Sequence, residues 1–367
     1  MNFRAGLIRT LVARGHEVVT VAPHDRHAPM LERMGCRYID LPMDNKGTNP
    51  IRDLMLMLKF FRLFRAERPD VFLGYTIKPN IYGSLAAHLM GIPVINNISG
   101  LGAAFISNTW LTKIVRILYR ISLYHSWCVF FQNEDDRGLF VSQNIVRVQR
   151  TSLLPGSGVD LAHFYLAPLQ EVGAENETRK PNFRFLLIAR LLWDKGVREY
   201  IEAARDIHRI FPKVEFCLLG LTDAQNPASI PRSQVDAWVA EGCIRYLGFK
   251  DDVRCDIEQA HCVVLPSYRE GTPRSLLEAA AMGRPIITTD TAGCRDVVDD
   301  GISGFLCEAR NSRDLAEKMV GMLRLTDAQR AEMGARGRKK IEREYDEKIV
   351  IQKYLDVIER FSAISRR

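Results

Sequence analysis

The sequence lacks several patterns that mark particular classes of protein. Eight cysteines are scattered among 367 residues and none forms a C-x-x-C pair, so we predict neither a disulfide framework nor a zinc site. No uninterrupted apolar run approaches the ~18 residues that a membrane-spanning helix needs. The first residues also lack the apolar core of a secretory signal. These absences favour a protein of a reducing compartment, the cytoplasm.

Common fingerprints of nucleotide and hydrolase chemistry are absent as well. No G-x-G-x-x-G follows a predicted strand, and no G-x-x-x-x-G-K-[ST] occurs, which argues against a dinucleotide cofactor and P-loop hydrolysis of ATP. No G-x-S-x-G motif suggests a Ser-His-Asp hydrolase. We therefore expect an activity that needs no cofactor and no metal.

The charge is only mildly unbalanced. Lys and Arg number 51 and Asp and Glu 44, which gives a net charge of +7. No long basic block suggests nucleic acid as a partner. The excess suits phosphorylated ligands or an anionic membrane surface, although general solubility explains the bulk charge equally well.

Helices and strands are predicted to alternate along the chain, which favours parallel sheets covered on both faces. The fold class is therefore α/β, with two doubly wound halves. Strands are expected near 18–22, 37–41, 71–74, 93–96, 127–132, 183–189, 214–219, 243–247, 262–266, 285–289 and 304–307. Helices are expected near 3–14, 28–34, 50–66, 79–90, 108–124, 196–210, 231–241, 252–260, 273–282, 293–300, 312–324, 327–343 and 346–363.

The domain boundary is expected close to residue 160. Residues 1–160 form one predicted domain and 161–345 the other, and the polar, glycine-containing stretch 154–182 is a predicted hinge. The first half begins on a helix, whereas doubly wound sheets usually begin on a central strand. We expect that first strand to be missing through a late start or truncation, with a genuine variant as the alternative.

One stretch of the second half has the pattern of an anion-binding site. The strand 262–266 is followed by a short loop and a helix that ends before Gly283. Thr272 is the expected N-cap and Pro273 the first helical residue. Backbone N–H groups and the helix dipole then face a bound phosphate.

Four charged side chains flank this pattern. Arg190 and Lys195 follow the first strand of the second half, where two cations suit a diphosphate. Glu270 precedes the helix and Glu278 lies about one and a half turns inside it. The two carboxylates could be a glycosidase-like pair, or merely a loop and a surface residue. A ribose contact by Glu278, with Glu270 near the transferred group, is the better interpretation.

The segment from Glu270 to Glu278 resembles the E-x7-E signature of retaining glycosyltransferases of family 4. Arg190 and Lys195 match the paired basic residues of that family, and 154–164 resembles its interdomain segment, with Ser157 inserted. The resemblance implies the GT-B fold, in which two Rossmann-like domains face across a cleft. It also implies that the helix 346–363 packs back on the first domain.

The resemblance assigns expected roles to the second half. Arg190 and Lys195 contact the donor diphosphate, and Glu270 contacts the donor sugar; these three are the expected catalytic residues. The other expected donor-binding residues are Glu278 at the ribose, Phe249 and Lys250 at the nucleobase, and Gly271, Thr272, Pro273, Arg274, Ser275 and Leu277 at the start of the helix.

The first half resembles the branch of the family that extends polyprenyl-diphosphate-linked oligosaccharides, including N-acetylgalactosaminyltransferases. The resemblance rests on Asn2-Phe-Arg4, 75–80 and 96–102. It makes Asn2, Arg4, Lys78 and Asn97 candidates for acceptor contacts, although Lys78 is equally well explained as an ordinary loop lysine.

Two segments of the first half favour contact with a membrane. Residues 51–68 and 105–124 combine apolar and aromatic side chains with cations such as Lys59, Arg62 and Lys113. Amphipathic helices of this kind can lie at the surface of a bilayer, although packing in the core explains each one alone. We expect peripheral association with the cytoplasmic face of the membrane.

Together these patterns predict a retaining, metal-independent glycosyltransferase. It would move a hexose or N-acetylhexosamine from a nucleotide sugar, with UDP as the expected nucleotide, to a lipid-linked or other glycan acceptor. Two alternatives remain open: a sugar-nucleotide epimerase of the same architecture, and a non-catalytic nucleotide-sugar-binding protein. An epimerase needs an acid–base set in the first half, and none is evident in the sequence.

Overall fold

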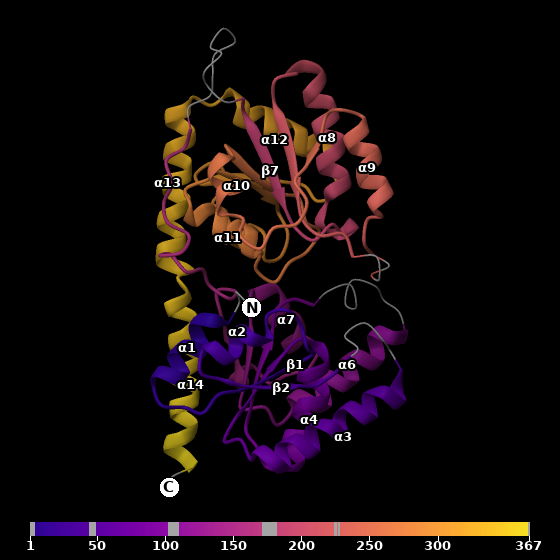
Figure 1. The fold of residues 1–367 in the computed structure, drawn as a ribbon, viewed down its shortest axis with the longest axis vertical. Coiled ribbons are helices and arrows are strands. Elements are labelled where there is room, and N and C mark those ends of the chain that lie inside the picture. The colour runs from indigo at the N-terminus through magenta and orange to yellow at the C-terminus, as the bar shows by residue number, and fades with distance from the viewer. Residues whose placement is uncertain are drawn as a thin grey trace. The chain divides into compact units, whose positions relative to one another are not determined.

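The computed structural model describes residues 4–43, 49–101, 110–170, 182–223, 226 and 228–365. The chain divides into two compact units, Met1–Gly158 with Glu347–Arg367, and Val159–Asp346 (Figure 1). Every pairing between the named strands of either unit is parallel. The predicted α/β class is confirmed, and the chain passes between the units close to the predicted boundary.

The first unit contains most of the predicted elements of the first half. In chain order they are α1 (Ala5–Ala13), β1 (Val19–Ala22), α2 (Ala28–Arg33), β2 (Arg37–Asp40), α3 (Pro50–Glu67), β3 (Phe72–Tyr75), the π-helix η1 (Pro79–Gly83), α4 (Ser84–Leu89), β4 (Val94–Ile98), α6 (Trp110–Leu123), β5 (Cys128–Phe131), α7 (Glu134–Ser142), the 3₁₀ turn η2 (Val148–Arg150), β6 (Thr151–Leu153) and α14 (Glu347–Ser365).

Alternate residues of β5 face opposite sides of the sheet. Cys128 and Phe130 pack in a cluster with residues of α1 and α14, whereas Val129 and Phe131 pack with residues of α6 and α7. A strand places successive side chains on opposite faces, so an apolar run is buried on both. The last helix, α14, is therefore part of the core of the first unit.

The strands of the first unit form two separate sheets, β1-β2 and β3-β4-β5-β6. In the second unit the opening strand, β7, lies between β8 and β10. Among the described residues of the first unit, no strand lies in the corresponding place between β1 and β3. A doubly wound half usually has its first strand at that position, and in the first unit the sheets β1-β2 and β3-β4-β5-β6 are separate there.

The second unit has a single sheet with the order β12-β11-β10-β7-β8-β9. Its elements are β7 (Arg184–Ile188), the 3₁₀ turn η3 (Trp193–Lys195), α8 (Val197–Ile210), β8 (Glu215–Leu219), α9 (Arg232–Ala240), β9 (Arg245–Tyr246), α10 (Arg254–Gln259), β10 (Cys262–Leu265), α11 (Arg274–Ala281), β11 (Ile286–Thr289), the 3₁₀ turn η4 (Arg295–Val297), β12 (Gly304–Cys307), α12 (Ser312–Arg324) and α13 (Asp327–Glu344).

Two sequence predictions about the fold need correction, and two elements were missed. The helix expected at 293–300 is wrong: only the short turn η4 forms there, after Gly293 with φ 78°. Part of the hinge expected at 154–182 is wrong too, because Val159, Phe164 and Ala167 are buried in the core of the second unit. The helix α7 and the strand β6 were not predicted at all.

Within the described residues, no helix is both long and apolar enough to cross a membrane.

Candidate functional site

The loop after β7 carries both predicted cations. Arg190 is exposed, whereas Lys195 ends the turn η3 and is partly buried. Gly196 follows with φ 70°, and a Cβ there would lie 2.0 Å from the carbonyl oxygen of Pro266. Only glycine allows this approach without displacement, so the residue holds the loop after β7 against the end of β10.

Lys195 and Glu270 form an ion pair between these two loops. The Lys195 Nζ donates to Glu270 Oε1, and the two side chains are 13% and 16% exposed. The Ser267 hydroxyl, which has one proton to donate, lies 2.9 Å from the same carboxylate oxygen and 3.1 Å from the carbonyl oxygen of Asp194. Glu270 is therefore held in one orientation by two donors from different loops.

A third loop, which follows β11, contacts the backbone of Glu270. The Glu270 backbone N–H donates to the carbonyl of Ala292 at 3.1 Å. A Cβ on Gly293 would lie 2.1 Å from the carbonyl oxygen of Gly271 and 2.5 Å from that of Glu270. The sequence prediction missed the supporting roles of Ser267 and Gly293; their positions next to strand ends were the only signal.

The helix α11 begins one residue later than predicted. Pro273, with φ −73° and ψ 113°, is its N-cap, and Arg274 is its first residue. The predictions of Thr272 as N-cap and Pro273 as first helical residue are wrong, because the extended ψ of Pro273 keeps it outside the helix. Pro273 itself makes no side-chain capping hydrogen bond. The start of a helix is the kind of place that suits an external anion.

Glu278 lies inside α11 and is buried, and one of its carboxylate oxygens accepts a hydrogen bond. The Arg274 Nε donates to Glu278 Oε1 at 2.6 Å. Burial raises the pKa of the Glu278 carboxyl, and the Arg274 guanidinium acts in the opposite direction. Ser275 is half-buried beside it, but the Leu277 side chain is buried in the core of the second unit. The donor contact expected of Leu277 stays a prediction.

The loop after β9 carries Phe249 and Lys250. Phe249 is half exposed, and the Lys250 Nζ donates to both carboxylate oxygens of Asp256, at 2.7 and 3.0 Å. The Gly220 N–H donates to the carbonyl of Gly248 at 2.8 Å, which ties this loop to the end of β8. In a parallel sheet all these loops lie at one edge. The predicted donor-binding residues of the second unit thus lie in these loops or on α11, which follows one of them.

The acceptor candidates of the first unit have different surroundings. Asn2 lies outside the described residues. The Arg4 guanidinium lies over the ring of Tyr75, 4.3 Å from its centroid. Asn97 is buried and donates to the Tyr354 hydroxyl of α14 at 2.8 Å. Its amide holds α14 on the sheet, and its role as an acceptor contact stays a prediction.

Lys78 is also buried, so the alternative of a solvated loop lysine is wrong, whereas its role as an acceptor contact stays a prediction. Its Nζ donates to Asp53 Oδ1 at 2.6 Å, and the Tyr82 hydroxyl donates to Asp53 Oδ2 at 2.9 Å. The carboxylate of Asp53 thus holds both groups in place.

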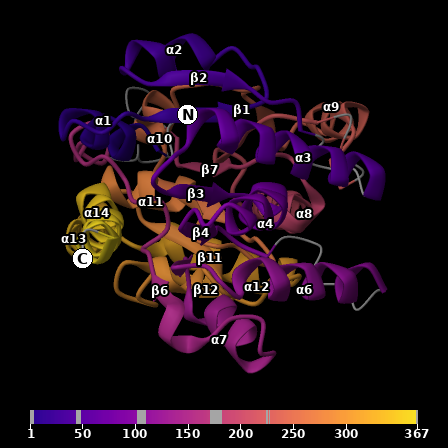
Figure 2. The ribbon, with the colours of Figure 1, turned by 90° about the horizontal axis from the view of Figure 1, so that it is seen from below.

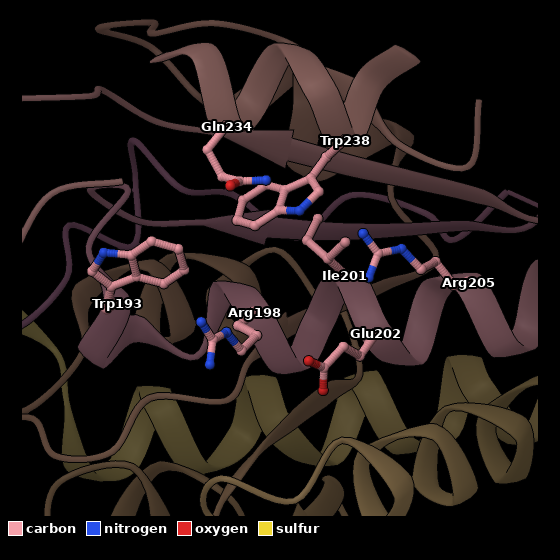
Figure 3. A pocket seen from close by; sticks show the side chains of 7 residues that line it. All are labelled: Trp193, Arg198, Ile201, Glu202, Arg205, Gln234 and Trp238. Atoms are coloured by element: carbon pink, nitrogen blue, oxygen red, sulfur yellow. The ribbon is translucent and has the colours of Figure 1, made fainter. Parts of the chain in front are cut away.

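A small pocket of about 130 Å³ lies on the side of the second unit formed by α8 and α9. Figure 3 shows the rings of Trp193 and Trp238 on its walls, with Arg198 and Gln234. None of the predicted donor-binding residues lines it. Within the described residues, no group of acidic, histidine or cysteine side chains is arranged to hold a metal ion.

Two family models match the chain and together cover most of both units. The "Glycosyl transferase 4-like domain" matches residues 3–156, and "Glycosyl transferases group 1" matches residues 182–324. The chain is a glycosyltransferase of family 4. The comparisons do not support the alternative of an epimerase.

Two curated relatives of this glycosyltransferase each align with most of the chain. The N,N'-diacetylbacillosaminyl-diphospho-undecaprenol alpha-1,3-N-acetylgalactosaminyltransferase of Campylobacter jejuni is 28% identical, over 98% of this chain and 95% of the relative. The UDP-Gal:alpha-D-GlcNAc-diphosphoundecaprenol alpha-1,3-galactosyltransferase of Escherichia coli is 26% identical, over 76% and 71%.

Solved structures show that the glycosyltransferase has the GT-B fold. Anabaena Alr3699/HepE, in complex with UDP-glucose, aligns with a TM-score of 0.76 at 18% identity, over 99% of this chain and 96% of the other. Sucrose-phosphate synthase from Thermosynechococcus elongatus aligns with a TM-score of 0.80 at 20% identity, over 98% and 92%.

Proposed function

We propose that the protein transfers a hexose or N-acetylhexosamine from UDP-sugar to a polyprenyl-diphosphate-linked glycan, with retention of configuration and without a metal ion. The observation that carries the donor assignment is the convergence of Arg190, the Lys195–Glu270 pair and the start of α11 at one edge of the second unit. Cations and backbone N–H groups there suit a diphosphate leaving group.

Each donor-side residue then has a distinct task. Arg190 and Lys195 neutralise the charge that develops on the leaving diphosphate, together with the N–H groups at the start of α11. Glu278 accepts hydrogen bonds from the ribose hydroxyls, and Phe249 and Lys250 lie beside the nucleobase. Glu270 orients the sugar, since Lys195 and Ser267 fix its carboxylate. These groups supply charge stabilisation without a divalent cation.

The acceptor class comes from the curated relatives. Two of them are named for transfer to sugars linked to undecaprenol through a diphosphate. The first of them aligns with nearly the whole length of this chain, including the first unit. This similarity favours a lipid-linked acceptor over a free sugar or a protein.

Three helices of the first unit, α3, α4 and α6, provide a surface for the membrane that holds such an acceptor. Trp110, Ile114, Ile117 and Ile121 of α6 are all exposed and lie at helical spacing on one face. Exposed apolar residues also lie on α3 and α4, and α4 packs against both α3 and α6, as Figure 2 shows. Neighbouring cations complete an interface suited to anionic lipids.

A transfer assay tests this function. Radiolabelled UDP-hexoses and UDP-N-acetylhexosamines are incubated with a polyprenyl-diphosphate-linked sugar, in buffer with excess EDTA. Label in the lipid fraction for one donor, with an anomeric centre of unchanged configuration by NMR, is the expected result. If no donor in the panel labels the lipid acceptor while free sugars are labelled, the proposed acceptor class is wrong.

Anionic vesicles test the membrane surface separately. Wild-type protein is expected to co-sediment with them, and Ile117→Glu to remain in the supernatant, because the substitution places a charge on the apolar face of α6. Equal sedimentation of the two proteins would contradict the proposed surface.

A further inference from the structure

Two side-chain contacts join the loop after β10 to the segment that runs from η3 into α8. One is the ion pair between Lys195 and Glu270. The other is a hydrogen bond that the Tyr268 hydroxyl donates to Glu199 Oε1 at 2.6 Å. Tyr268 is two residues before Glu270, and Glu199 is four residues after Lys195, in the first turn of α8. The hydrogen bond therefore joins the same two segments as the ion pair, a few residues away from it.

Tyr268 contacts three other segments of the second unit. Its backbone N–H donates to the carbonyl of Asp194 in η3 at 2.9 Å, and its hydroxyl donates to Glu199 of α8. The Arg310 guanidinium, from the loop after β12, lies over its ring, 4.6 Å from the centroid. Burial and the hydrogen bond to Glu199 raise the pKa of the Tyr268 hydroxyl, so it remains a donor at neutral pH.

Glu199 is an unfavourable residue for a buried position. It is 6% exposed, and Tyr268 is the one hydrogen-bond donor to its carboxylate among the described residues. Its Oε2 is buried and accepts no hydrogen bond from them. A buried carboxylate with an unpaired oxygen lowers stability, and the positive end of the α8 dipole offsets only part of this cost. An apolar side chain would fill the position without it, so stability alone does not account for the carboxylate.

The ion pair and the hydrogen bond differ in what donor binding does to them. In the proposed complex Lys195 exchanges Glu270 for the donor phosphates. The hydrogen bond between Tyr268 and Glu199 involves neither of these groups and is retained. Together with the backbone hydrogen bond to Asp194, it keeps η3 beside the loop after β10 when the ion pair opens.

We propose that Tyr268 and Glu199 are positioning residues, which hold Lys195 and Glu270 at the spacing that a nucleoside diphosphate requires. The inference rests on the proposed function and deepens it, because it names two residues that act on the donor through others. Neither side chain touches the ligand. Their influence on donor binding is therefore lost when Lys195 is removed.

Titration calorimetry of the full chain with UDP tests the proposal. Tyr268→Phe keeps the ring and removes the hydroxyl. It should weaken UDP binding about tenfold, the order expected when one hydrogen bond to a charged group is lost. Glu199→Gln retains an acceptor for the Tyr268 hydroxyl, so its affinity should stay within about threefold of wild type.

Tyr200→Phe is the matched control. It removes a buried hydroxyl from the same helix, which lies 3.2 and 3.1 Å from the carbonyl oxygens of Phe185 and Cys217 in the core. This variant should bind UDP as wild type does. An equal loss of affinity in Tyr200→Phe and Tyr268→Phe would show a general effect on folding and would overturn the proposal.

Two combined variants separate positioning from stability. Tyr268→Phe introduced into Lys195→Ala should change UDP affinity by less than about twofold, because the lysine that it positions is gone. Tyr268→Phe with Glu199→Leu replaces both hydrogen-bonding groups by apolar ones. This pair should unfold at about the temperature of wild type, yet bind UDP about tenfold more weakly.

Two further results would contradict the proposal. One is wild-type affinity for UDP in Tyr268→Phe. The other is the same loss from Tyr268→Phe whether or not Lys195 is present. Failure of the proposed function has a different signature: wild-type protein would bind UDP, and the variants would show the expected pattern, but no sugar would reach a lipid-linked acceptor. Tighter binding of GDP or ADP would correct the proposed nucleotide, and the same pattern among the variants would still support the positioning role.

Discussion

The ammonium of Lys195 and the carboxylate of Glu270 neutralise each other across two loops of the second unit. In the proposed complex a donor diphosphate competes with Glu270 for the lysine. We expect Ser267 to remain hydrogen-bonded to the carboxylate when Lys195 pairs with the phosphates. The proposed site is then organised around Glu270, and Lys195 is the group that changes partner.

Lys195→Ala should lower kcat about 10²–10³-fold with donor at saturation, the usual cost of losing one group that stabilises developing charge. The variant also leaves Glu270 without its cation beside the leaving diphosphate. Initial rates of sugar transfer measure the effect. Arg313→Ala, at a residue whose side chain is 91% exposed on α12, is the control. A Lys195→Ala rate within threefold of wild type would contradict the assignment.

Glu278→Gln should raise the dissociation constant for the donor about tenfold, roughly 1.4 kcal/mol, with a smaller effect on kcat. An amide accepts weaker hydrogen bonds from ribose than a carboxylate does. Because burial raises the pKa of Glu278, wild-type affinity should fall with decreasing pH earlier than an ordinary glutamate predicts. Titration calorimetry at several pH values should show that this decline is absent from the variant.

Gly293→Ala should destabilise the second unit and abolish transfer, since its Cβ would lie 2.1 Å from the carbonyl oxygen of Gly271. Gly242→Ala is the matched control: it also has a positive φ, 84°, but no atom lies within 4 Å of its Cβ. The control should cost only about 1–2 kcal/mol of backbone strain. Thermal unfolding and transfer assays compare the two, and equal losses would show that the contact does not matter.

His261→Asn should make the second unit less sensitive to acid. Burial, with a smaller effect of Arg330, lowers the pKa of His261 to about 4. Between about pH 6.5 and that value the unfolded chain binds a proton that the folded chain does not, so stability falls as pH falls. The free energy of unfolding should therefore fall by about 2 kcal/mol between pH 7 and pH 5 because of this one histidine.

The backbone N–H of Arg184 donates to His261 Nδ1 at 3.0 Å. The side-chain oxygen of asparagine can accept the same hydrogen bond, but asparagine cannot take up a proton. Urea unfolding at the two pH values measures the difference, with the exposed His16→Asn as control. Equal acid sensitivity of His261→Asn and wild type would show that His261 does not titrate as described.

The strands of the second unit could be predicted from sequence because their signal is local. In β7, Phe185 and Leu187 pack in one cluster and Leu186 and Ile188 in the other, which reads as a continuous apolar run. The helix α7 carried a signal that was not used: Asn133 caps it, and three acidic residues fill its first turn. The error at Pro273 arose because its ψ, and not its identity, decides whether it is helical.

Local sequence patterns could not predict which residues surround the candidate site residues. Lys78 and Asp53 are 25 positions apart, and Asn97 and Tyr354 are 257 apart. Only the folded sheet brings such partners together, and nothing in the neighbouring sequence distinguishes a buried lysine from a solvated one. The same holds for Glu270, whose support by Gly293 depends on the close approach of two loops.

The composition of the first unit has a consequence for synthesis on the ribosome. Its core includes Val350, Tyr354, Leu355 and Ile358 of α14, packed with Leu7 and Leu11 of α1. The second unit is one uninterrupted stretch, Val159–Asp346, and needs nothing made later. The second unit can therefore fold while the chain is still being synthesised. The first unit is synthesised earliest, but it must stay partly unfolded and accessible to chaperones until α14 has left the ribosome.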